Sequence, residues 1–465
     1  MALANSKSTV EKCPYVSTES KEYLSSATAP PIRSVRIGTD DSAVIIGEET
    51  VLFRHDKTFN HPTCFSALIP DTMEVQEIAG YVDRANSIVF ERVGTKMKLD
   101  MLAVKSVSGN HTRFVETVST VRSRSRLPLI LMCSDSETMA AVLEICGGDR
   151  PLIYAAEPHN YVQMSSLSVK YRCPLVVRTG PAILDRQGNA CSGQSEADAV
   201  DAHLRRLNEF VESVRSLGVK DIVLDTGAFR GQAYIKVQTS LRRLAIKKSI
   251  RTFGYPTISV FEPDENVFGD GKPEDTAVCA EDVLIHGAIS VMKYASIVVF
   301  PEMRKDIIYP LMTLRQNIYT DPQKPIRVNP GVYEINHPAT PSSPVLITTN
   351  FSLTYFTVSA DTEKSRIPCY LLVADTDGLS VLTAYAAGKF PPESVAGLIK
   401  DTGIADKINH RQIIIPGMVG RMSQKLKELT GWDVVVGPMD SSGIPSFLKS
   451  MLRMAYPVQE GKSQL

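Results

Sequence analysis

The sequence predicts an α/β protein in which a (β/α)8 TIM-like barrel precedes a doubly wound, Rossmann-like sheet. Between Arg36 and Tyr319, short apolar runs alternate with stretches of helical period. From Val345 onward, apolar runs break into small and hydroxyl residues, and a proline-rich stretch separates the two regions. Apolar runs of about four to eight residues bounded by turn residues are typical of buried parallel strands.

Composition excludes several classes of function. A chain of 465 residues has room for two or three domains. Lys plus Arg (51) equals Asp plus Glu (51), so no bulk charge attracts nucleic acid or an anionic membrane. No apolar run approaches the roughly 18 residues of a membrane span, and the first residues lack the apolar core of a signal peptide. We therefore expect a cytoplasmic protein without a nucleic-acid or membrane partner.

Eight apolar runs in the first region predict the strands of the barrel. With the helices between them they extend over about 250 residues, which matches a (β/α)8 barrel. Gly180–Glu196 and Glu262–Asp275 are expected to be long loops. The predicted strands are Phe65–Leu68, Met101–Val104, Leu129–Met132, Leu152–Ala155, Leu175–Val177, Ile222–Leu224, Thr257–Val260 and Ile297–Val299.

Two helices between these runs have clear signals. Ser136–Gly148 is expected to begin with Ser136 as N-cap and to end at a glycine pair. Ala199–Val219 can end at Gly218, and its apolar residues fall on one helix face: Leu204, Leu207, Val211 and Val214.

Polar residues that follow the predicted strands are the candidates for chemistry in the barrel, because barrel enzymes work at the carboxyl ends of their strands. Asp225 could accept a proton or orient a substrate, but capping of the next helix is an equally simple role for such a carboxylate. His159 and Glu157 have no third metal ligand at a recognisable spacing. The candidates are Asp135, Glu157, His159, Arg178, Asp225 and Glu262.

Asp321–Pro344 holds six prolines, which rules out a regular helix or a central strand. The segment is predicted to be a semi-rigid connector, and an ordered strap packed on the barrel is the alternative. The eight cysteines form no Cys-x-x-Cys pair, so a cysteine-ligated zinc site is not expected. Most are expected to be buried apolar residues.

Four turns rich in Gly, Ser and Thr follow the apolar runs of the last region. Because all four come after parallel strands, we expect them to open on one edge of the sheet, where such folds bind ligands. Glycine lets the backbone approach a ligand closely, and hydroxyl groups can bond to amides. The turns are Thr348–Asn350, Asp377–Ser380, Pro416–Met418 and Ser441–Gly443.

Several segments in the same order resemble the large (gamma) subunit of the corrinoid iron–sulfur protein of the CO dehydrogenase/acetyl-CoA synthase system. They are TTNFSLTYF (348–356), DTDGLSVLTAYAAGKF (375–390), IIIPGMVG (413–420) and GPMDSSGIP (437–445), preceded by ETVLFRHDKTF (49–59), FERVGTKMKLDMLAV (90–104) and CPLVVR (173–178). The resemblance covers nearly the whole chain. It implies a remnant of a cluster-binding module at 1–35, a barrel at 36–320, a connector at 321–344 and a corrinoid (cobalamin)-binding domain at 345–465.

The resemblance also implies a set of residues around the corrinoid. Thr383 is expected near the cobalt, with Thr376 as second choice, and a bond from Thr383 back to a helix carbonyl is the alternative. His410 has no Asp-x-His-x-x-Gly setting, so the corrinoid is expected base-off, without a histidine ligand. The expected cofactor-binding residues are Thr348, Thr349, Asn350, Thr354, Thr376, Gly378, Leu379, Ser380, Thr383, Gly417, Met418, Gly437, Ser442, Gly443, Ile444 and Pro445.

The iron–sulfur cluster of the family is not expected in this chain. EKCPYVSTE (11–19) resembles the end of the cluster-binding module, but Cys13 is the one cysteine there, whereas a [4Fe–4S] cluster needs about four ligands. A partner chain that supplies ligands, or a truncated sequence, would leave this open.

The implied function is to carry a methyl group on cobalt from a methyl-pterin methyltransferase to a second acceptor. The implied partners are a smaller barrel subunit, the methyltransferase, acetyl-CoA synthase and a reductive activator protein. Three alternatives stay open: a subunit of a demethylation system, an enzyme whose barrel binds methyl-pterin, and a structural subunit without cofactor.

Overall fold

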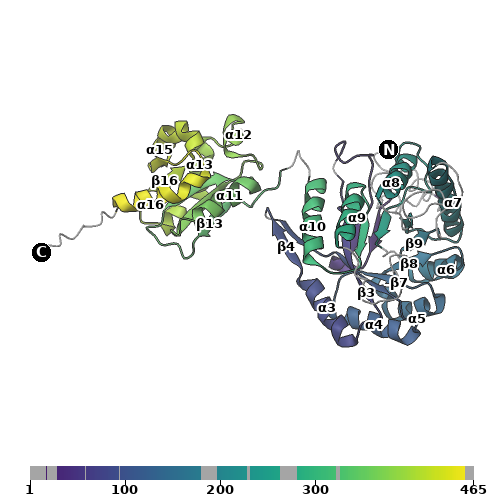
Figure 1. Cartoon of the computed structure of the whole chain (residues 1–465). Coiled ribbons are helices and arrows are strands. Elements are labelled where there is room, and N and C mark those ends of the chain that lie inside the picture. Colours follow the sequence, from purple (N-terminus) through teal and green to yellow (C-terminus); the bar gives the residue numbers. More distant parts are fainter. Residues whose placement is uncertain are drawn as a thin grey trace. The chain divides into compact units, whose positions relative to one another are not determined.

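The structure, a computed structural model, describes residues 17, 29–57, 59–93, 95–179, 196–227, 231–261, 280–320 and 325–455. Cys13, Glu262, the predicted loop 262–275 and all but the last residue of the predicted loop 180–196 lie outside the described residues. The chain forms two compact units: the first comprises Met1–Phe90 and Met97–Tyr319, and the second comprises Glu91–Lys96 and Thr320–Leu465. Figure 1 shows the first unit in purple to green and the second in green to yellow.

The first unit is a closed barrel of eight parallel strands, so the barrel prediction is confirmed. Each of the eight predicted apolar runs lies within one barrel strand, and a helix follows each strand (Figure 1). The strands are β3 (Cys64–Pro70), β6 (Met101–Lys105), β7 (Leu129–Met132), β8 (Leu152–Ala156), β9 (Leu175–Arg178), β10 (Ile222–Asp225), β11 (Thr257–Val260) and β12 (Ile297–Phe300).

The helices of the barrel pack against the outer faces of the strands through one apolar stripe each. In α7 the four predicted apolar residues are buried, and Gly218 follows the helix with φ +91°. The helices are α3 (Val75–Ser87), α4 (His111–Arg124), α5 (Ser136–Cys146), α6 (Tyr161–Tyr171), α7 (Glu196–Ser216), α8 (Gly231–Ile246), α9 (Ala280–Met292) and α10 (Lys305–Tyr319).

The predicted N-cap of α5 is wrong by one residue. Asp135, not Ser136, caps the helix, because its side chain accepts a 2.8 Å hydrogen bond from Thr138 N. Asp and Ser both cap helices well, and only the backbone path decides which of two neighbours has the extended conformation that an N-cap needs. Asp135, a candidate for chemistry, thus has the capping role.

Two further pairs of short strands lie outside the two main sheets. The antiparallel strands β1 (Val35–Ile37) and β2 (Val44–Ile46) pack buried Val35, Ile37 and Ile46 against the inward-facing residues of the barrel strands. Gly38 N donates to Arg150 O just before β8, so this hairpin lies at the amino end of the barrel. β4 (Val89–Arg92) and β5 (Thr95–Lys98) form a second two-stranded sheet.

The second unit is built on a five-stranded sheet in the order β13–β15–β14–β16–β17. Four strands are parallel, and β13 (Gly331–Ile335) pairs with β15 as an antiparallel edge strand. The proline-rich segment therefore contributes a strand where a connector was expected. The strand itself contains no proline. Prolines lie on both sides of it, and proline is tolerated near an edge strand because it cannot donate a hydrogen bond inside a sheet. The parallel strands are β14 (Val345–Thr349), β15 (Cys369–Ala374), β16 (Gln412–Ile415) and β17 (Asp433–Val436).

Helices cover both faces of this sheet. One apolar cluster joins Ile347, Leu372 and Ile413 to residues of α12, α13 and α15, and another joins Leu346, Leu371 and Ile414 to α16. The elements are α11 (Ser352–Glu363), α12 (Val381–Ala386), α13 (Pro392–Asp401), α14 (Ile404–Lys407), η6 (Gly417–Met422), α15 (Ser423–Thr430), η7 (Ser441–Gly443) and α16 (Ile444–Ala455).

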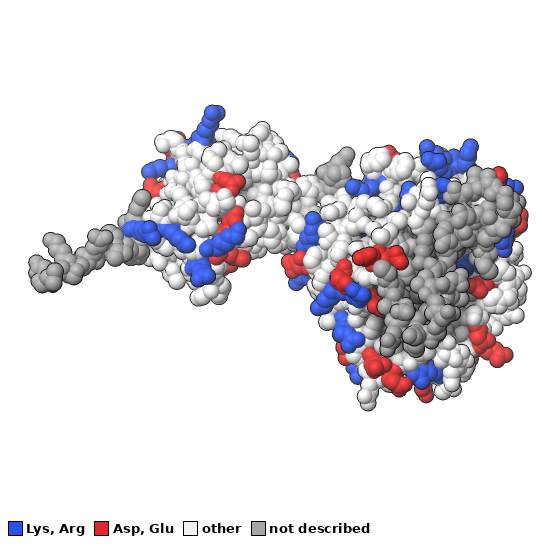
Figure 2. Space-filling model, in the orientation of Figure 1, with Lys and Arg blue, Asp and Glu red and all other residues white. Residues whose placement is uncertain are grey.

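The surface carries both signs of charge. On the face of each unit seen in Figure 2, Lys and Arg side chains alternate with Asp and Glu, and neither sign dominates. Within the described residues, no helix combines the length and the apolar character that a membrane crossing requires.

Candidate functional site

A cavity of about 450 Å³ opens at the carboxyl ends of β14 and β16 in the second unit. β14 lies between β15 and β16 in the sheet, so the chain leaves neighbouring strands toward opposite faces. This arrangement leaves a crevice at the strand ends, which is where open α/β sheets bind their ligands.

The lining of the cavity is largely apolar with a minority of hydroxyl groups. The four turns predicted from the sequence each contribute to it, through Thr348, Ser380, Met418 and Ser441. Four large apolar side chains at the cavity are unusually exposed: Leu353 (57%), Leu382 (56%), Met418 (45%) and Met439 (66%). Exposed apolar side chains grouped in this way are typical of a binding surface.

The structure brings seven of the predicted cofactor-binding residues together in this lining and leaves nine outside it. Those in the lining are Thr348, Thr354, Ser380, Thr383, Met418, Gly437 and Ile444. Those outside it are Thr349, Asn350, Thr376, Gly378, Leu379, Gly417, Ser442, Gly443 and Pro445. Several of the second group hold the turns in place.

Sequence reasoning missed the contribution of two helices to the wall. α11 lines the cavity with Leu353, Thr357 and Val358 in addition to the predicted Thr354, and α16 lines it with Phe447 in addition to Ile444. The spacing of the α11 residues by four positions puts them on one helix face, a signal that could have identified them. Pro438, Met439 and Asp440 after β17 were also missed.

Two hydroxyl groups at the end of β14 are buried without a hydrogen-bond partner. Thr348 and Thr349 are both fully buried, and the Oγ1 atom of each is unpaired. Successive residues of a strand point to opposite faces of the sheet, and only Thr348 lines the cavity. A buried hydroxyl without a partner is costly, so Thr348 Oγ1 is available to a ligand that can bond to it.

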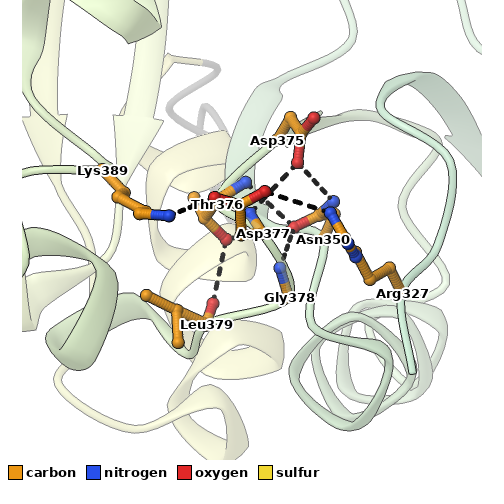
Figure 3. A network of polar contacts seen from close by, with 8 residues as sticks. All are labelled: Arg327, Asn350, Asp375, Thr376, Asp377, Gly378, Leu379 and Lys389. Carbon is orange, nitrogen blue, oxygen red and sulfur yellow. Dashed lines mark hydrogen bonds and ion pairs between the residues drawn. The ribbon is translucent and has the colours of Figure 1, made fainter. Parts of the chain in front are cut away.

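The turn between β15 and α12 is held by the buried side chain of Asn350 (Figure 3). Asn350 Oδ1 accepts hydrogen bonds of 3.0 Å from Thr376 N and from Gly378 N, and Asn350 Nδ2 donates to Asp375 Oδ1 at 2.9 Å. On the outer side, Asp377 forms ion pairs with Arg327 (3.1 Å) and Lys389. These ion pairs lower the pKa of Asp377, with Lys389 as the larger cause.

The turns after β16 and β17 hold each other. Gly417 N donates a 3.0 Å hydrogen bond to Pro438 O, and a Cβ atom on Gly417 would lie 2.7 Å from Gly437 O. Ser441 Oγ donates to Asp361 Oδ2 of α11 at 2.6 Å, and Ser442 N donates to Asp440 Oδ1. Glycine at position 417 is therefore required by the close approach of the two backbones.

Thr383 bonds to a side chain, not to a helix carbonyl. Its Oγ1 atom lies 3.0 Å from Ser380 Oγ, so the two hydroxyl groups form a pair in the cavity wall. His410 Nε2 lies 3.0 Å from Ser343 O, and His410 precedes β16, at the opposite end of the strand from the cavity. Among the described residues, no histidine lines the cavity.

Four of the candidates in the barrel form one chain of polar contacts at the carboxyl ends of β8, β9 and β10. Tyr154 OH donates to Asp225 Oδ2 at 2.6 Å, and Gly227 N donates to Asp225 Oδ1 at 2.8 Å. Arg178 lies 3.7 Å from both Asp225 and Glu157, and His159 lies 3.6 Å from Glu157. In the part of the chain that the structure describes, no group of three or more His, Cys, Asp or Glu residues could hold a metal ion.

Asp71, at the end of β3, is a buried carboxylate that sequence reasoning missed. Burial by itself raises its pKa, but hydrogen bonds from Ser108 N and Val107 N, both 2.8 Å, and from Ser108 Oγ outweigh this and lower the pKa below its usual value. All these donors belong to the loop after β6, so Asp71 orders that loop.

The chain matches a family model described as "CO dehydrogenase/acetyl-CoA synthase delta subunit" over residues 34–189 and 197–448. It is 39% identical to "Corrinoid/iron-sulfur protein large subunit" of Moorella thermoacetica over 97% of this chain and 93% of the relative. "Acetyl-CoA decarbonylase/synthase complex subunit gamma" of Methanothermobacter thermautotrophicus is 35% identical over 95% of this chain and 91% of its own length. The same-named subunit of Archaeoglobus fulgidus is 37% identical over 94% and 88%.

Proposed function

This chain belongs to the CO dehydrogenase/acetyl-CoA synthase delta subunit family, and from that premise we propose that it carries a methyl group on a corrinoid held at the cavity of its second unit. The observation that carries the proposal is the convergence of four turns on one cavity at the strand ends. The names of the relatives support the corrinoid as the ligand and the acetyl-CoA pathway as the setting.

The residues of the cavity fit a corrinoid. A corrin ring is a flat, mostly apolar plate with an amide fringe and a nucleotide tail. An apolar surface for the ring is formed by the exposed side chains of Leu353, Leu382, Met418 and Met439. Thr348 Oγ1, buried and unpaired, offers a hydrogen bond to a part of the ligand that enters the cavity. We assign the second unit from Val345 onward as a Rossmann-like corrinoid-binding domain on this basis.

When bound, the corrinoid supplies a cobalt centre that can accept a methyl group and pass it on. The protein orients the ring and sets its surroundings. Thr383, with its hydroxyl bonded to that of Ser380, is the side chain we place beside the metal. No imidazole of the described residues lines the cavity, so we propose that this chain would supply no histidine ligand to a bound corrinoid.

The barrel serves in this proposal as a scaffold and docking surface. The relatives are subunits of a complex by name, and we propose that this chain also works in a complex, with a smaller barrel subunit, a methyl-pterin methyltransferase, acetyl-CoA synthase and a reductive activator. The activator is needed if, as we propose, this chain by itself holds no iron–sulfur cluster. Cys13, the residue on which that point rests, lies outside the described residues.

Reconstitution tests the proposal. The full chain is incubated with hydroxocobalamin, desalted and examined by absorption spectroscopy, together with an iron assay. We expect one corrinoid per chain, with the spectrum of a base-off cobalamin. Thr383→Val should alter that spectrum at equal occupancy. Loss of all corrinoid on desalting would contradict the proposed function, and an unaltered Thr383→Val spectrum would remove the role given to Thr383.

A further inference from the structure

Asn350 belongs to the first of the four turns, yet its side chain faces away from the cavity. It is 1% exposed and is absent from the cavity lining, whereas Thr348, two residues earlier, is part of it. The hydrogen bonds of the Asn350 side chain go to the β15–α12 turn (Figure 3). Its Oδ1 atom accepts from three donors, Thr376 N, Thr376 Oγ1 and Gly378 N, so it has no lone pair left for a ligand.

The orientation of the Asn350 amide is determined by its partners. Its Oδ1 atom faces two backbone N–H donors, Thr376 N and Gly378 N, each at 3.0 Å. Its Nδ2 atom faces the carboxylate of Asp375, which can only accept. A flipped amide would point its NH2 group at the N–H groups of Thr376 and Gly378, which are also donors. The hydrogen-bond network therefore determines which amide atom is oxygen and which is nitrogen.

The turn held by Asn350 has a backbone that needs such support. Asp377 and Gly378 are consecutive residues with φ of +56° and +74°. The left-handed conformation is unfavourable for a residue with a Cβ atom such as Asp377, so surrounding contacts must maintain it. Asn350 supplies these contacts on the buried side, and the ion pairs of Asp377 lie on the exposed side.

The same turn leads directly into the cavity wall. Thr376 Oγ1 lies 3.0 Å from both Asn350 Oδ1 and Leu379 O, so its single proton is shared between two acceptors. Leu379 N donates to Thr376 O. The next residue is Ser380, whose hydroxyl pairs with that of Thr383 in the lining. The position of this hydroxyl pair is therefore coupled to Asn350 through one threonine.

We propose that Asn350 is a positioning residue: it touches no ligand and sets the β15–α12 turn so that Ser380 and Thr383 face the corrinoid. The inference rests on the proposed function and goes beyond it. The sequence predicted that Asn350 binds the corrinoid directly, whereas we assign it a role without contact to the ligand.

The test exchanges the donor and the acceptor of the hydrogen bond between Asn350 and Asp375. Asn350→Asp keeps an oxygen for the two backbone donors but places a second carboxylate oxygen against Asp375. We expect the dissociation constant for hydroxocobalamin to rise about tenfold, as for the loss of one buried contact, and the spectrum of the bound corrinoid to change. Adding Asp375→Asn removes the second negative charge and lets the new amide donate to the carboxylate at position 350. The same Asp375 oxygen also accepts from Asp377 N, so we expect the affinity to return in part, to between that of Asn350→Asp and that of wild type.

Two controls accompany the exchange. Trp432, the single tryptophan of the chain, is buried in the second unit, and its unchanged fluorescence shows that a variant is folded. Asp433→Asn removes an exposed ion pair with Lys427 at the amino end of β17, away from the cavity turns, so its affinity should stay within about twofold of wild type.

The outcomes separate the two proposals. If wild type retains cobalamin and Asn350→Asp binds it equally well with the same spectrum, the positioning role is wrong and the proposed function stands. If the double variant binds as weakly as Asn350→Asp, the repulsion between positions 350 and 375 does not cause the loss of affinity, and the inference is again overturned. If wild type retains no cobalamin, the proposed function fails and the inference fails with it.

Discussion

Ser441 Oγ donates a 2.6 Å hydrogen bond to Asp361 Oδ2, although the two residues lie 80 positions apart in the chain. Asp361 is on α11, and Ser441 follows β17, so this contact joins the two helical walls of the cavity. Lys364 bonds to the other carboxylate oxygen at 2.7 Å. Helix α11, which follows the first turn, thus holds the fourth turn in place through this hydrogen bond.

The Asp361 contact should make the stability of the protein depend on pH in acid. Hydrogen bonds from Lys364 and then Ser441 lower the pKa of the Asp361 carboxyl from its ordinary value of 3.8. A carboxyl with a lowered pKa in the folded state stabilises the fold fully above its ordinary pKa, and this contribution is lost as the pH falls through the folded value. We expect Asp361→Asn to cost about 1 kcal/mol near neutral pH and nothing in strong acid, measured by urea unfolding.

Ser441→Ala should show part of the same loss, because it removes one donor from the Asp361 carboxylate. Ser442→Ala is the matched control, since the Ser442 side chain is exposed and bonds to Asp440, not to Asp361. Equal effects of the two alanines at neutral pH would contradict the role of the Ser441–Asp361 contact.

The unpaired hydroxyl groups of β14 predict opposite effects on stability and binding. Thr348→Val removes a buried hydroxyl without a partner, and the ligand-free protein should gain about 1 kcal/mol in the free energy of unfolding. The same change should weaken cobalamin binding, because Thr348 lines the cavity. Thr349→Val, on the opposite face of the strand, should give the gain in stability without the loss of binding. Unfolding by urea and titration with hydroxocobalamin measure the two effects.

Alanine substitutions at Gly378 and Gly388 should distinguish the cost of a positive φ angle from the cost of a steric contact. Both have positive φ, +74° and +69°, so alanine should cost each about 1 kcal/mol. A Cβ atom on Gly378 would also lie 3.0 Å from Arg327 Cγ and 3.1 Å from Pro325 Cγ, whereas one on Gly388 meets nothing within 4 Å. We therefore expect Gly378→Ala to lower the thermal midpoint more than Gly388→Ala does. Equal shifts would mean that the segment from Pro325 to Arg327 moves away freely.

The described cysteines should be inert in the folded protein. Burial raises the pKa of Cys146, Cys173 and Cys369 to about 12, and it also raises the pKa of Cys64 and Cys133. Because the thiolate is the reactive form, iodoacetamide at about pH 8 should not modify these five residues until urea unfolds the chain. Peptide mass spectrometry distinguishes them from Cys13, Cys191 and Cys279, which lie outside the described residues. Labelling of Cys369 in the native state would show that the second unit opens.

The sequence by itself determined the barrel and much of the second sheet. Each of the eight apolar runs became a barrel strand, and the apolar stripe of α7 became buried. Both signals, a short apolar run and a helical spacing of apolar residues, lie in residues that are close together in the sequence. The four turns after the strands were also recognisable, since Gly, Ser, Thr and Asn have local reasons to occur there.

Only the tertiary structure decided which way each side chain of these turns points and what lies opposite it. Thr348 enters the cavity lining and Asn350 does not, although both belong to one turn, because β14 ends at Thr349 and the β15–α12 turn binds the side chain of Asn350. The pairing of β13 with β15 and the contact of Ser441 with Asp361 join segments distant in the chain. Such pairings depend on which surfaces meet after folding, and no local pattern of residues encodes that meeting.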